Sequence, residues 1–353
     1  MKGNIMELSF RPYDLRLTHT WTVASSLAQG GKKVYPAVFV ELRDADGVTG
    51  LGEAAPSNRY RETTQTCTEF LQLVDARRLS FENVAGSMAY VEALTPGNYS
   101  PKGAINIALL DGAAKRARQP LHDYLCLGFD EGRHVTSFTI GIDSPERIRQ
   151  KVREAEAFPI LKFKVGSPTD TENLAALREI APTKTVRVDA NEAWTTKEEA
   201  LRRIESLARD LHIEFIEQPM PATMPSEDFA WLKERSPLPI MADESYLNAG
   251  DLARCAGCFH AVNVKLCKTG GVTRGFEALA AARKAGLKTM LGCMIESSIL
   301  TAAGAHLAEL TDYLDLDGNL LITNDPFAGV TSERGMMSFA GATEPFGLRV
   351  RSR

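Results

Sequence analysis

The stretch LKFKVG, residues 161–166, alternates lysines with apolar residues. Successive side chains of a β-strand point to opposite faces, so the alternation predicts a strand with Lys162 and Lys164 on one face and the apolar residues on the other. Two lysines on the inner face of a packed sheet are costly unless chemistry requires them. The stretch therefore predicts a buried strand beside a site that uses amines.

Seven further short apolar or β-branched runs recur along the chain, separated by charged segments with helical periodicity. Strands that alternate with helices predict βαβ units and a parallel sheet. Eight such strands indicate the α/β fold class and a TIM-like (β/α) barrel, whose last unit we expect to be truncated because the region is shorter than the typical ~250 residues. The runs are TSFTIGI (136–142), LKFKVG (161–166), TVRVDAN (185–191), IEFIEQP (213–219), IMADES (240–245), AVNVKLCK (261–268), TMLGCMIE (289–296) and YLDLDGN (313–319).

The first part of the chain has a different pattern. KKVYPAVFVELRDADGVTGLGEAA, residues 32–55, predicts two strands around the turn DADG, and AINIALLDGAAKRA, residues 104–117, predicts a helix. We therefore expect an α+β capping domain over residues 1–130 and the barrel over residues 131–321. Residues 322–353 lose the strand–helix rhythm, and we expect them to pack back on the capping domain.

Composition excludes several classes of function. The 353 residues carry 45 acidic and 41 basic side chains, a net charge of −4 that gives no electrostatic reason to expect nucleic acid or a membrane as partner. The opening residues predict no export signal, and no apolar run approaches the roughly 18 residues of a membrane span. We expect a cytoplasmic protein with reduced thiols that acts on a small molecule, and a homo-oligomer stays open. The C-x-x-C of Cys255 and Cys258 lacks a second ligand pair for zinc and predicts buried thiols on a helix.

Three acidic residues end consecutive predicted strands: Asp189 in TVRVDAN, Glu217 in IEFIEQP and Asp243 in IMADES. The C-terminal ends of barrel strands meet at one mouth, where three carboxylates repel one another unless a cation lies among them. Oxygen ligands suit a hard ion such as Mg²⁺. A single acid at such a position is more often a helix cap, but three at matching strand ends favour a magnesium site.

A further lysine lies on the opposite wall. In AVNVKLCK, Lys265 shares strand parity with Asn263, so Lys164 and Lys265, on the second and sixth strands, face each other across the barrel. This arrangement predicts two bases that flank one carbon. The inward lysines Lys162 and Lys164 are expected to lower each other's pKa values, which would make a lysine a usable base near neutrality. Lys268 has the other parity and is interpreted as structural or loop-exposed.

The last strand, YLDLDGN, presents Asp315 and Asp317 with the same parity. Two unpaired carboxylates at this strand end predict a site for a cationic group of the substrate, such as an α-ammonium. The alternative is a simple cap of the following turn.

These motifs together resemble the enolase superfamily, in its muconate-lactonizing-enzyme-like branch, over essentially the full chain. The matching marks are K-x-K in LKFKVG, D-x-N in VDANEAW, EQP in IEFIEQP, ADES in IMADES, and NVKLCKTGG. Within that branch, DLDG is similar to the D-x-D of the dipeptide epimerases, the group that includes L-Ala-D/L-Glu epimerase, and SNRYRE is similar to the loop that covers their substrate. The resemblance implies a magnesium-dependent dipeptide epimerase that works by two-base 1,1-proton transfer through an enediolate.

The resemblance also implies a role for each site residue. The metal ligands would be Asp189, Glu217 and Asp243, and the two bases Lys164 and Lys265. The substrate contacts would be Lys162, which also steadies Lys164, together with Thr139, Ile295, Asp315 and Asp317. The capping loops at residues 20–33 and 57–62 would select the substrate side chain.

The chain departs from the pattern at one place. Some members hold a substrate glutamate with a capping-loop arginine, whereas this chain has Trp21 and small residues there. The residues that could substitute are Arg59, Arg61, Lys32 and Lys33.

Other reactions of the superfamily use the same metal and lysines. A muconate cycloisomerase, an o-succinylbenzoate synthase or an N-acylamino-acid racemase needs no acids to receive an ammonium, so Asp315 and Asp317 argue against these alternatives. Acid-sugar dehydratases usually have a histidine where this chain has Lys265. A non-catalytic barrel that binds metal or peptide is the alternative from a different class, and lysines on both walls argue against it.

Overall fold

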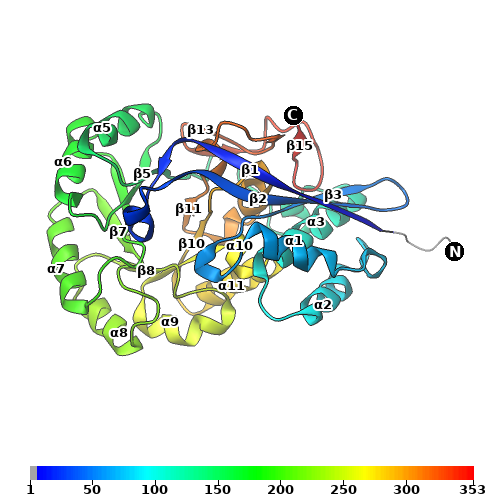
Figure 1. The fold of residues 1–353 in the computed structure, drawn as a ribbon, viewed down its shortest axis with the longest axis horizontal. Helices are drawn as coiled ribbons and strands as arrows, with labels where there is room; N and C mark the ends of the chain where they lie inside the picture. The colour runs from blue at the N-terminus through cyan, green and yellow to red at the C-terminus, as the bar shows by residue number, and fades with distance from the viewer. Residues whose placement is uncertain (1–5) are drawn as a thin grey trace.

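The eight predicted strands form one parallel sheet in the computed structural model, which describes residues 6–353 (Figure 1). Neighbours in this sheet are neighbours in the sequence from β4 to β11. A bridge between Thr136 and Leu314 brings the chain before β4 against β11, so the sheet curls into a nearly closed barrel and the barrel prediction is confirmed. The strands are β4 (Phe138–Ile140), β5 (Ile160–Lys164), β6 (Thr185–Asp189), β7 (Ile213–Glu217), β8 (Ile240–Ala242), β9 (Ala261–Lys265), β10 (Lys288–Gly292) and β11 (Tyr313–Asp315).

Helices follow seven of these eight strands within residues 6–353, and those from α5 to α9 line the outer side of the barrel in Figure 1. Local signals fix where they begin: the Ser144 hydroxyl accepts a hydrogen bond from the amide of Arg147 at the start of α5, with Pro145 in the first turn. After β11 comes only a 3₁₀ turn, η6 (Gly318–Leu320), which is the truncated last unit. The helices are α5 (Pro145–Glu154), α6 (Asp170–Ile180), α7 (Lys197–Leu207), α8 (Ser226–Arg235), α9 (Leu252–Cys258), α10 (Leu266–Thr269), α11 (Val272–Lys284) and α12 (Ser298–Ala305).

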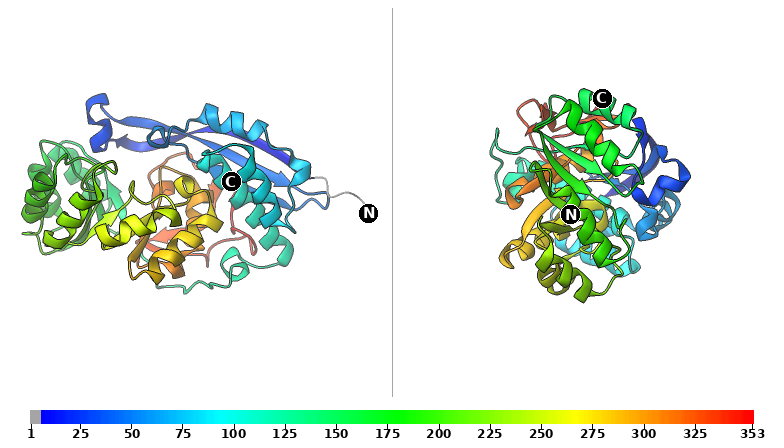
Figure 2. Two further views of the ribbon diagram at one scale, coloured as in Figure 1. Left: turned by 90° about the horizontal axis from the view of Figure 1, so that it is seen from below. Right: turned by 90° about the vertical axis from the view of Figure 1, so that its left-hand side faces the viewer.

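The N-terminal part forms a three-stranded antiparallel sheet. The predicted hairpin is β2 (Lys32–Arg43) and β3 (Thr49–Ala54), and its turn is held by Asp44, whose side chain accepts two backbone amides. The sequence did not predict the long strand β1 (Glu7–Trp21), in which charges and a proline interrupt the apolar pattern. The left view of Figure 2 shows this sheet along one side of the barrel.

One helix packs unusually close to this sheet. Gly50 and Gly52 of β3 face α3 (Tyr99–Ala117), and a Cβ atom at either glycine would lie 2.0 Å from a carbonyl oxygen of Ala108 or Ala104. Only glycine permits this approach. Two shorter helices, α1 (Thr64–Gln72) and α2 (Val84–Leu94), complete the capping layer.

A buried carboxylate joins this sheet to the barrel. Glu53 of β3 accepts hydrogen bonds from the amide and hydroxyl of Ser297 (2.9 and 2.6 Å) and from the amide of Leu300 (3.3 Å), at the N-terminus of α12. Burial raises the pKa of Glu53 to about 7 despite these donors. The two parts of the chain are thus held together by a polar contact as well as by apolar packing.

The C-terminal segment lies against both parts. The Phe327 ring meets Phe39 of β2 edge-on at 4.9 Å, while the amide of Met337 donates to the carbonyl of His134 (2.8 Å). The boundaries at residues 130 and 321 stay predictions, and the first five residues of the predicted capping domain lie outside the described residues. The strands here are β12 (Phe327–Ala328), β13 (Thr331–Glu333), β14 (Met336–Ser338) and β15 (Arg351–Ser352).

The paired thiols of the C-x-x-C motif are buried in and at the end of α9, as predicted. No helix among residues 6–353 combines the length and the apolar character needed to cross a membrane.

Two buried histidines tie α12 to the C-terminal segment. The Nδ1 atom of His306 accepts the backbone amide of His122 (3.2 Å) and lies 2.8 Å from Nδ1 of that ring, while its Nε2 atom donates to the carbonyl of Leu348 (3.1 Å). This pattern is complete only when the His306 ring is neutral, because its Nδ1 atom has to accept while the Nδ1 atom of His122 donates. Burial lowers the pKa of both rings, that of His306 well below its usual value, and the nearby Arg349 acts in the same direction.

We therefore predict that acid destabilises the protein through this pair. Because the folded pKa values are lowered, the unfolded chain binds protons first, so the stability is fully present above the usual histidine pKa of about 6.5 and is lost as the pH falls below it. The loss should reach about 1.4 kcal/mol per pH unit for each ring. Urea unfolding at pH 7.5 and 5.5 should show a weaker pH dependence for His306→Gln. The same change at the exposed His212 is the control, and an unchanged slope in His306→Gln would contradict the prediction.

Candidate active site

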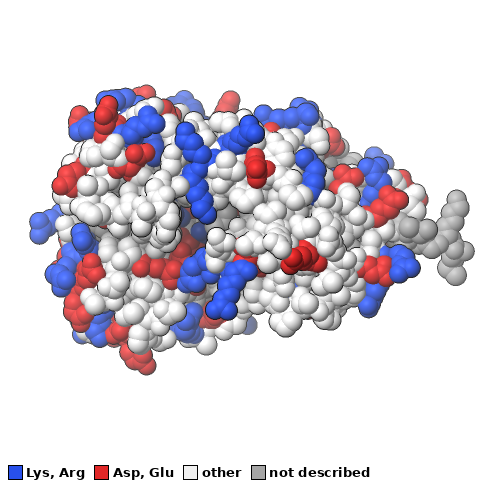
Figure 3. Space-filling view, viewed as in Figure 1, with Lys and Arg blue, Asp and Glu red and all other residues white. Residues whose placement is uncertain are grey.

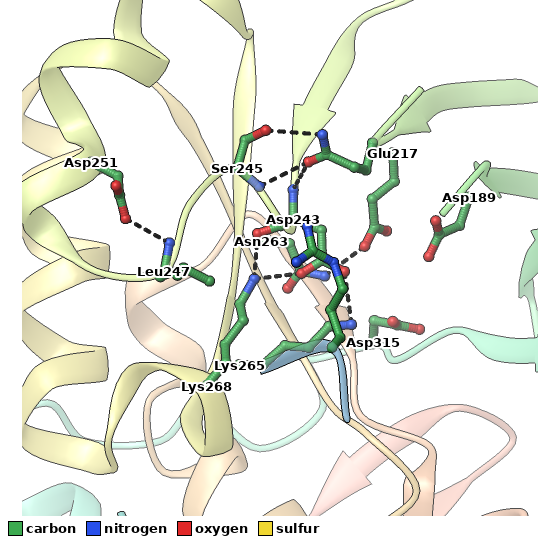
Figure 4. Close-up of polar contacts among 12 residues, drawn as sticks. Asp189, Glu217, Asp243, Ser245, Leu247, Asp251, Asn263, Lys265, Lys268 and Asp315 are labelled. Carbon is green, nitrogen blue, oxygen red and sulfur yellow. Dashed lines mark hydrogen bonds and ion pairs between the residues drawn. The ribbon is translucent and has the colours of Figure 1, made fainter. Parts of the chain in front are cut away.

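Three carboxylates meet at the C-terminal ends of neighbouring barrel strands. Asp189 and Glu217 end β6 and β7 and are partners in the sheet register, and Asp243 follows β8 by one residue. One oxygen from each lies within 4.8 Å of the other two, and all three side chains are buried. Figure 4 shows these carboxylates turned toward one another. The strand register alone therefore brings three negative charges into one small space.

Lys162 occupies the centre of the charge network. Its ammonium lies 3.1 Å from Asp189, 2.9 Å from Glu217 and 2.7 Å from Asp315. Burial alone would lower the pKa of Lys162, but these carboxylates, Asp315 most strongly, hold it well above its usual value. Lys162 is therefore a fixed positive charge that joins Asp189 and Glu217 to the last strand, and the expected lowering of its pKa was wrong.

Three more buried lysines contact the outer acids from two sides. Lys164 of β5 lies 2.6 Å from Asp189, and Lys265 of β9 lies 2.8 Å from Asp243. Lys268 is also buried and donates to the carboxylate and the backbone carbonyl of Asp243. Loop exposure of Lys268 was thus a wrong alternative, because the residue belongs to the turn α10, which carries its side chain back under β8.

The ionisation of the three acids reflects this crowding. Burial opposes the charge on Asp189, but Lys164 and Lys162 overcome it and lower its pKa to about 2. Burial and the neighbouring Asp189 raise the pKa of Glu217 to about 7. The oxygens Glu217 Oε2 and Asp243 Oδ2 are buried without a hydrogen bond of good geometry, although an ammonium lies within ion-pair distance of each. A buried oxygen set with unused acceptors fits a divalent cation.

The two acids of the last strand differ in their surroundings. Asp315 is not unpaired as predicted: it binds Lys162 and accepts the Ser137 hydroxyl at 2.7 Å. Asp317 accepts the backbone amide of Thr139 at 2.6 Å, but no ammonium within residues 6–353 pairs with it, and burial together with Asp315 raises its pKa to about 6. Its side chain does not cap η6, so the cap alternative is wrong.

Aromatic residues of the capping loops close the mouth. The Trp21 ring lies with its centroid 5.9 Å from the Lys164 ammonium. Tyr60 is half-buried, and burial, followed by the negative charge of Asp243, raises its pKa well above its usual value. Ile295 is buried after β10, and Thr139 contributes its backbone to Asp317.

Two supporting residues were not predicted from the sequence. The Asn263 side chain donates to Glu217 at 2.8 Å, and Gln218 accepts the amides of Asp243 and Ser245 at 2.9 and 3.1 Å. The shared parity of Asn263 with Lys265 was the available signal for the first. Gln218 lies in the EQP motif with a positive φ of 36°, and the sequence alone gave no direction for its side chain.

Comparison with known proteins identifies the family. Residues 15–126 match the N-terminal domain of the mandelate racemase and muconate lactonizing enzyme family, and residues 146–323 match the enolase C-terminal domain-like family. The chain belongs to the enolase superfamily, which confirms the resemblance seen in its motifs.

Relatives narrow the comparison further. The chain is 60% identical over 348 residues to the L-Ala-D/L-amino acid epimerase of Pedosphaera parvula, covering 99% of this chain and 100% of that protein. It is 37% identical to the L-Ala-D/L-Glu epimerase of Bacteroides thetaiotaomicron, covering 95% and 86%. A dipeptide epimerase from Enterococcus faecalis, solved in complex with Mg and L-Leu-L-Tyr, superposes with a TM-score of 0.88 at 30% identity, covering 99% and 100%.

We predict that Mg²⁺ raises the midpoint of thermal unfolding by a few degrees, because an ion that binds only the folded state stabilises it. Glu217→Gln should abolish the rise, since it removes one ligand charge while its amide oxygen can still accept from Asn263. Differential scanning calorimetry with and without the ion measures both. Glu205→Gln, the same change on the exposed face of α7, is the control, and a full rise in the Glu217 variant would contradict the prediction.

Proposed function

We propose that this chain is a magnesium-dependent dipeptide epimerase that inverts the α-carbon next to the substrate carboxylate. One observation carries the proposal: Lys164 and Lys265, on different walls of the barrel, contact opposite members of one carboxylate trio whose ligand atoms lie within 4.8 Å. Amines placed in this way bracket the space in front of the trio, where an α-carbon can be reached from both faces.

Asp189, Glu217 and Asp243 would hold the Mg²⁺ ion. When bound, the ion supplies positive charge at the substrate carboxylate, where negative charge develops as the α-proton leaves. The buried ammonium of Lys162 adds a fixed positive charge beside the same trio. Because these charges are in place before reaction, they favour the enediolate over the starting carboxylate.

The two bases act in sequence on opposite faces. The neutral amine of one lysine takes the α-proton and becomes an ammonium, and the ammonium of the other returns a proton to the opposite face and becomes an amine. Lys164 removes the proton from one enantiomer and Lys265 from the other, so the reaction runs in both directions without loss of atoms.

Asp315 and Asp317 would receive the α-ammonium of the dipeptide. Asp317 is the better placed of the two, since it is buried without a cation partner among the described residues and its pKa is raised to about 6. An ammonium beside it would restore the balance of charge. Thr139, in the middle of β4, and Ile295, three residues after β10, would contact the same part of the substrate.

The relatives support the choice of substrate class. Two curated relatives carry names of L-Ala dipeptide epimerases, and the superposed structure holds Mg and a dipeptide. The six cysteines are free thiols, in keeping with the proposed site of action in the cytoplasm.

We predict that Lys265→Ala abolishes epimerisation but retains α-proton exchange with solvent from one enantiomer of the substrate. The remaining lysine can still remove and return a proton on its own face, whereas no group delivers one on the other. Proton NMR in D₂O with separate dipeptide enantiomers measures the exchange. Lys164→Ala should retain exchange from the opposite enantiomer.

Full racemisation in either lysine variant would contradict the two-base mechanism. Lys233→Ala, on the outer helix α8 with its ammonium on the Ala256 carbonyl, is a control that should keep the complete reaction.

We predict further that the site rejects substrates without a free ammonium. N-acetyl-L-Ala dipeptides should have at least about a hundredfold lower kcat/KM than the free dipeptides, because Asp317 would be left buried and uncompensated. Asp317→Asn should raise KM for the free dipeptide and reduce the ratio of kcat/KM between free and N-acetylated dipeptides. Equal kcat/KM values for free and acetylated substrates would instead favour the alternative function, that of an N-acylamino-acid racemase.

A further inference from the structure

We propose that Glu192 holds Arg59 away from the substrate and so limits the epimerised residue of the dipeptide to an uncharged side chain. The inference rests on the proposed function and names its substrate class. It concerns a pair of residues outside the metal trio and the two bases, one in a capping loop and one in the loop after β6.

The two side chains form a two-point ion pair. The Arg59 guanidinium donates from Nε to Glu192 Oε2 at 2.7 Å and from Nη2 to Oε1 at 2.8 Å. Paired planar contacts of this kind are the strongest that arginine makes with a carboxylate. Glu192 Oε1 also accepts the backbone amide of Ala222 at 2.7 Å, which fixes the carboxylate to the loop after β7. Arg59 is therefore anchored to the barrel.

The pair lies at the mouth of the site. The guanidinium carbon of Arg59 lies 6.0 Å from the centroid of the Tyr60 ring, and Glu192 lies three residues after Asp189, which ends β6. The pKa of Arg59 is raised chiefly by its hydrogen bonds to Glu192 and, more weakly, by Glu244 next to the metal trio. An anionic side chain entering the mouth would meet a guanidinium whose charge is already neutralised.

The other cations near the mouth are exposed or already paired. Lys32, Lys33 and Arg61 complete the lysines and arginines of the two capping loops, residues 20–33 and 57–62, and all three are exposed. Four buried lysines lie around the metal trio, and each contacts at least one carboxylate; they are Lys162, Lys164, Lys265 and Lys268. Figure 3 shows basic and acidic side chains interspersed over this face of the molecule.

The mouth itself suits an uncharged group. Trp21 offers aromatic surface beside Lys164, and the Tyr60 ring lies beside Arg59. Glu244 contributes a carboxyl oxygen that is buried without a hydrogen bond, and this oxygen gives a substrate carboxylate no positive partner. Glutamine, leucine or phenylalanine at the second position of the dipeptide needs no such partner.

The isosteric substrates L-Ala-L-Gln and L-Ala-L-Glu isolate the effect of charge. We expect the protein with Mg²⁺ to exchange the α-proton of L-Ala-L-Gln in D₂O with kcat/KM about tenfold or more above that for L-Ala-L-Glu. L-Ala-L-Leu should be used at a rate similar to that of the glutamine dipeptide. Equal kcat/KM for the Gln and Glu substrates would overturn the inference while leaving the epimerase function in place.

Glu192→Gln tests the role of the ion pair. The glutamine oxygen can still accept the Ala222 amide, so the loop is retained while Arg59 loses its anionic partner and becomes available. The ratio of kcat/KM for L-Ala-L-Gln to kcat/KM for L-Ala-L-Glu should therefore fall about tenfold. Glu198→Gln, the same change of charge on the exposed face of α7, should leave the preference as it is.

The double variant Arg59→Gln/Glu192→Gln separates the two residues. It should regain the preference of the unmodified protein, because no guanidinium remains to bind an anion. An unchanged preference in Glu192→Gln, or a lowered preference that persists in the double variant, would overturn the inference. If none of the three dipeptides exchanges, the proposed function itself fails, and the inference falls with it.

Discussion

The repulsion among three buried carboxylates is the constraint on which the rest of the site depends. Asp189, Glu217 and Asp243 lie too close to remain charged without compensation. Lysines on two walls of the barrel supply part of the compensating positive charge. The carboxylate oxygens that lack a hydrogen bond indicate where a cation supplies the rest. The lysines that balance the charge of the trio are thus the residues placed to work on a substrate carboxylate. Stability and reactivity come from the same contacts.

The register of the barrel strands alone brings the three acids together. Neighbouring parallel strands end at one level, so a single acid per strand suffices to gather the trio. Lys164 and Asp189 are direct register partners, as are Asp189 and Glu217. The capping sheet then closes the mouth with aromatic side chains. Rigid strands carry the acids and lysines whose positions must be precise for catalysis, and loops carry the side chains that distinguish substrates.

Sequence reasoning succeeded where periodicity decides the geometry. The eight strands, the hairpin and the inward direction of Lys162 follow from alternation within a few residues. It failed where partners come from distant segments: β1 gains its partner only by pairing with β2, Lys268 is buried by a turn that returns under β8, and Asp315 meets Lys162 across the barrel. The contact between Arg59 and Glu192 joins segments that are 133 residues apart, and no local sequence pattern predicts it.

The Glu53 contact with α12 has a consequence for how such proteins can be recombined. Glu53 of the capping sheet accepts hydrogen bonds from amides and a hydroxyl of the barrel, so each part leaves buried polar groups without partners when the other is replaced. A chimera that grafts a foreign lid onto this barrel would leave the first turn of that helix with unfilled donors unless the graft brings an acid at the same point. Exchange of specificity between relatives is therefore easier by point changes in the loops than by swapping whole halves.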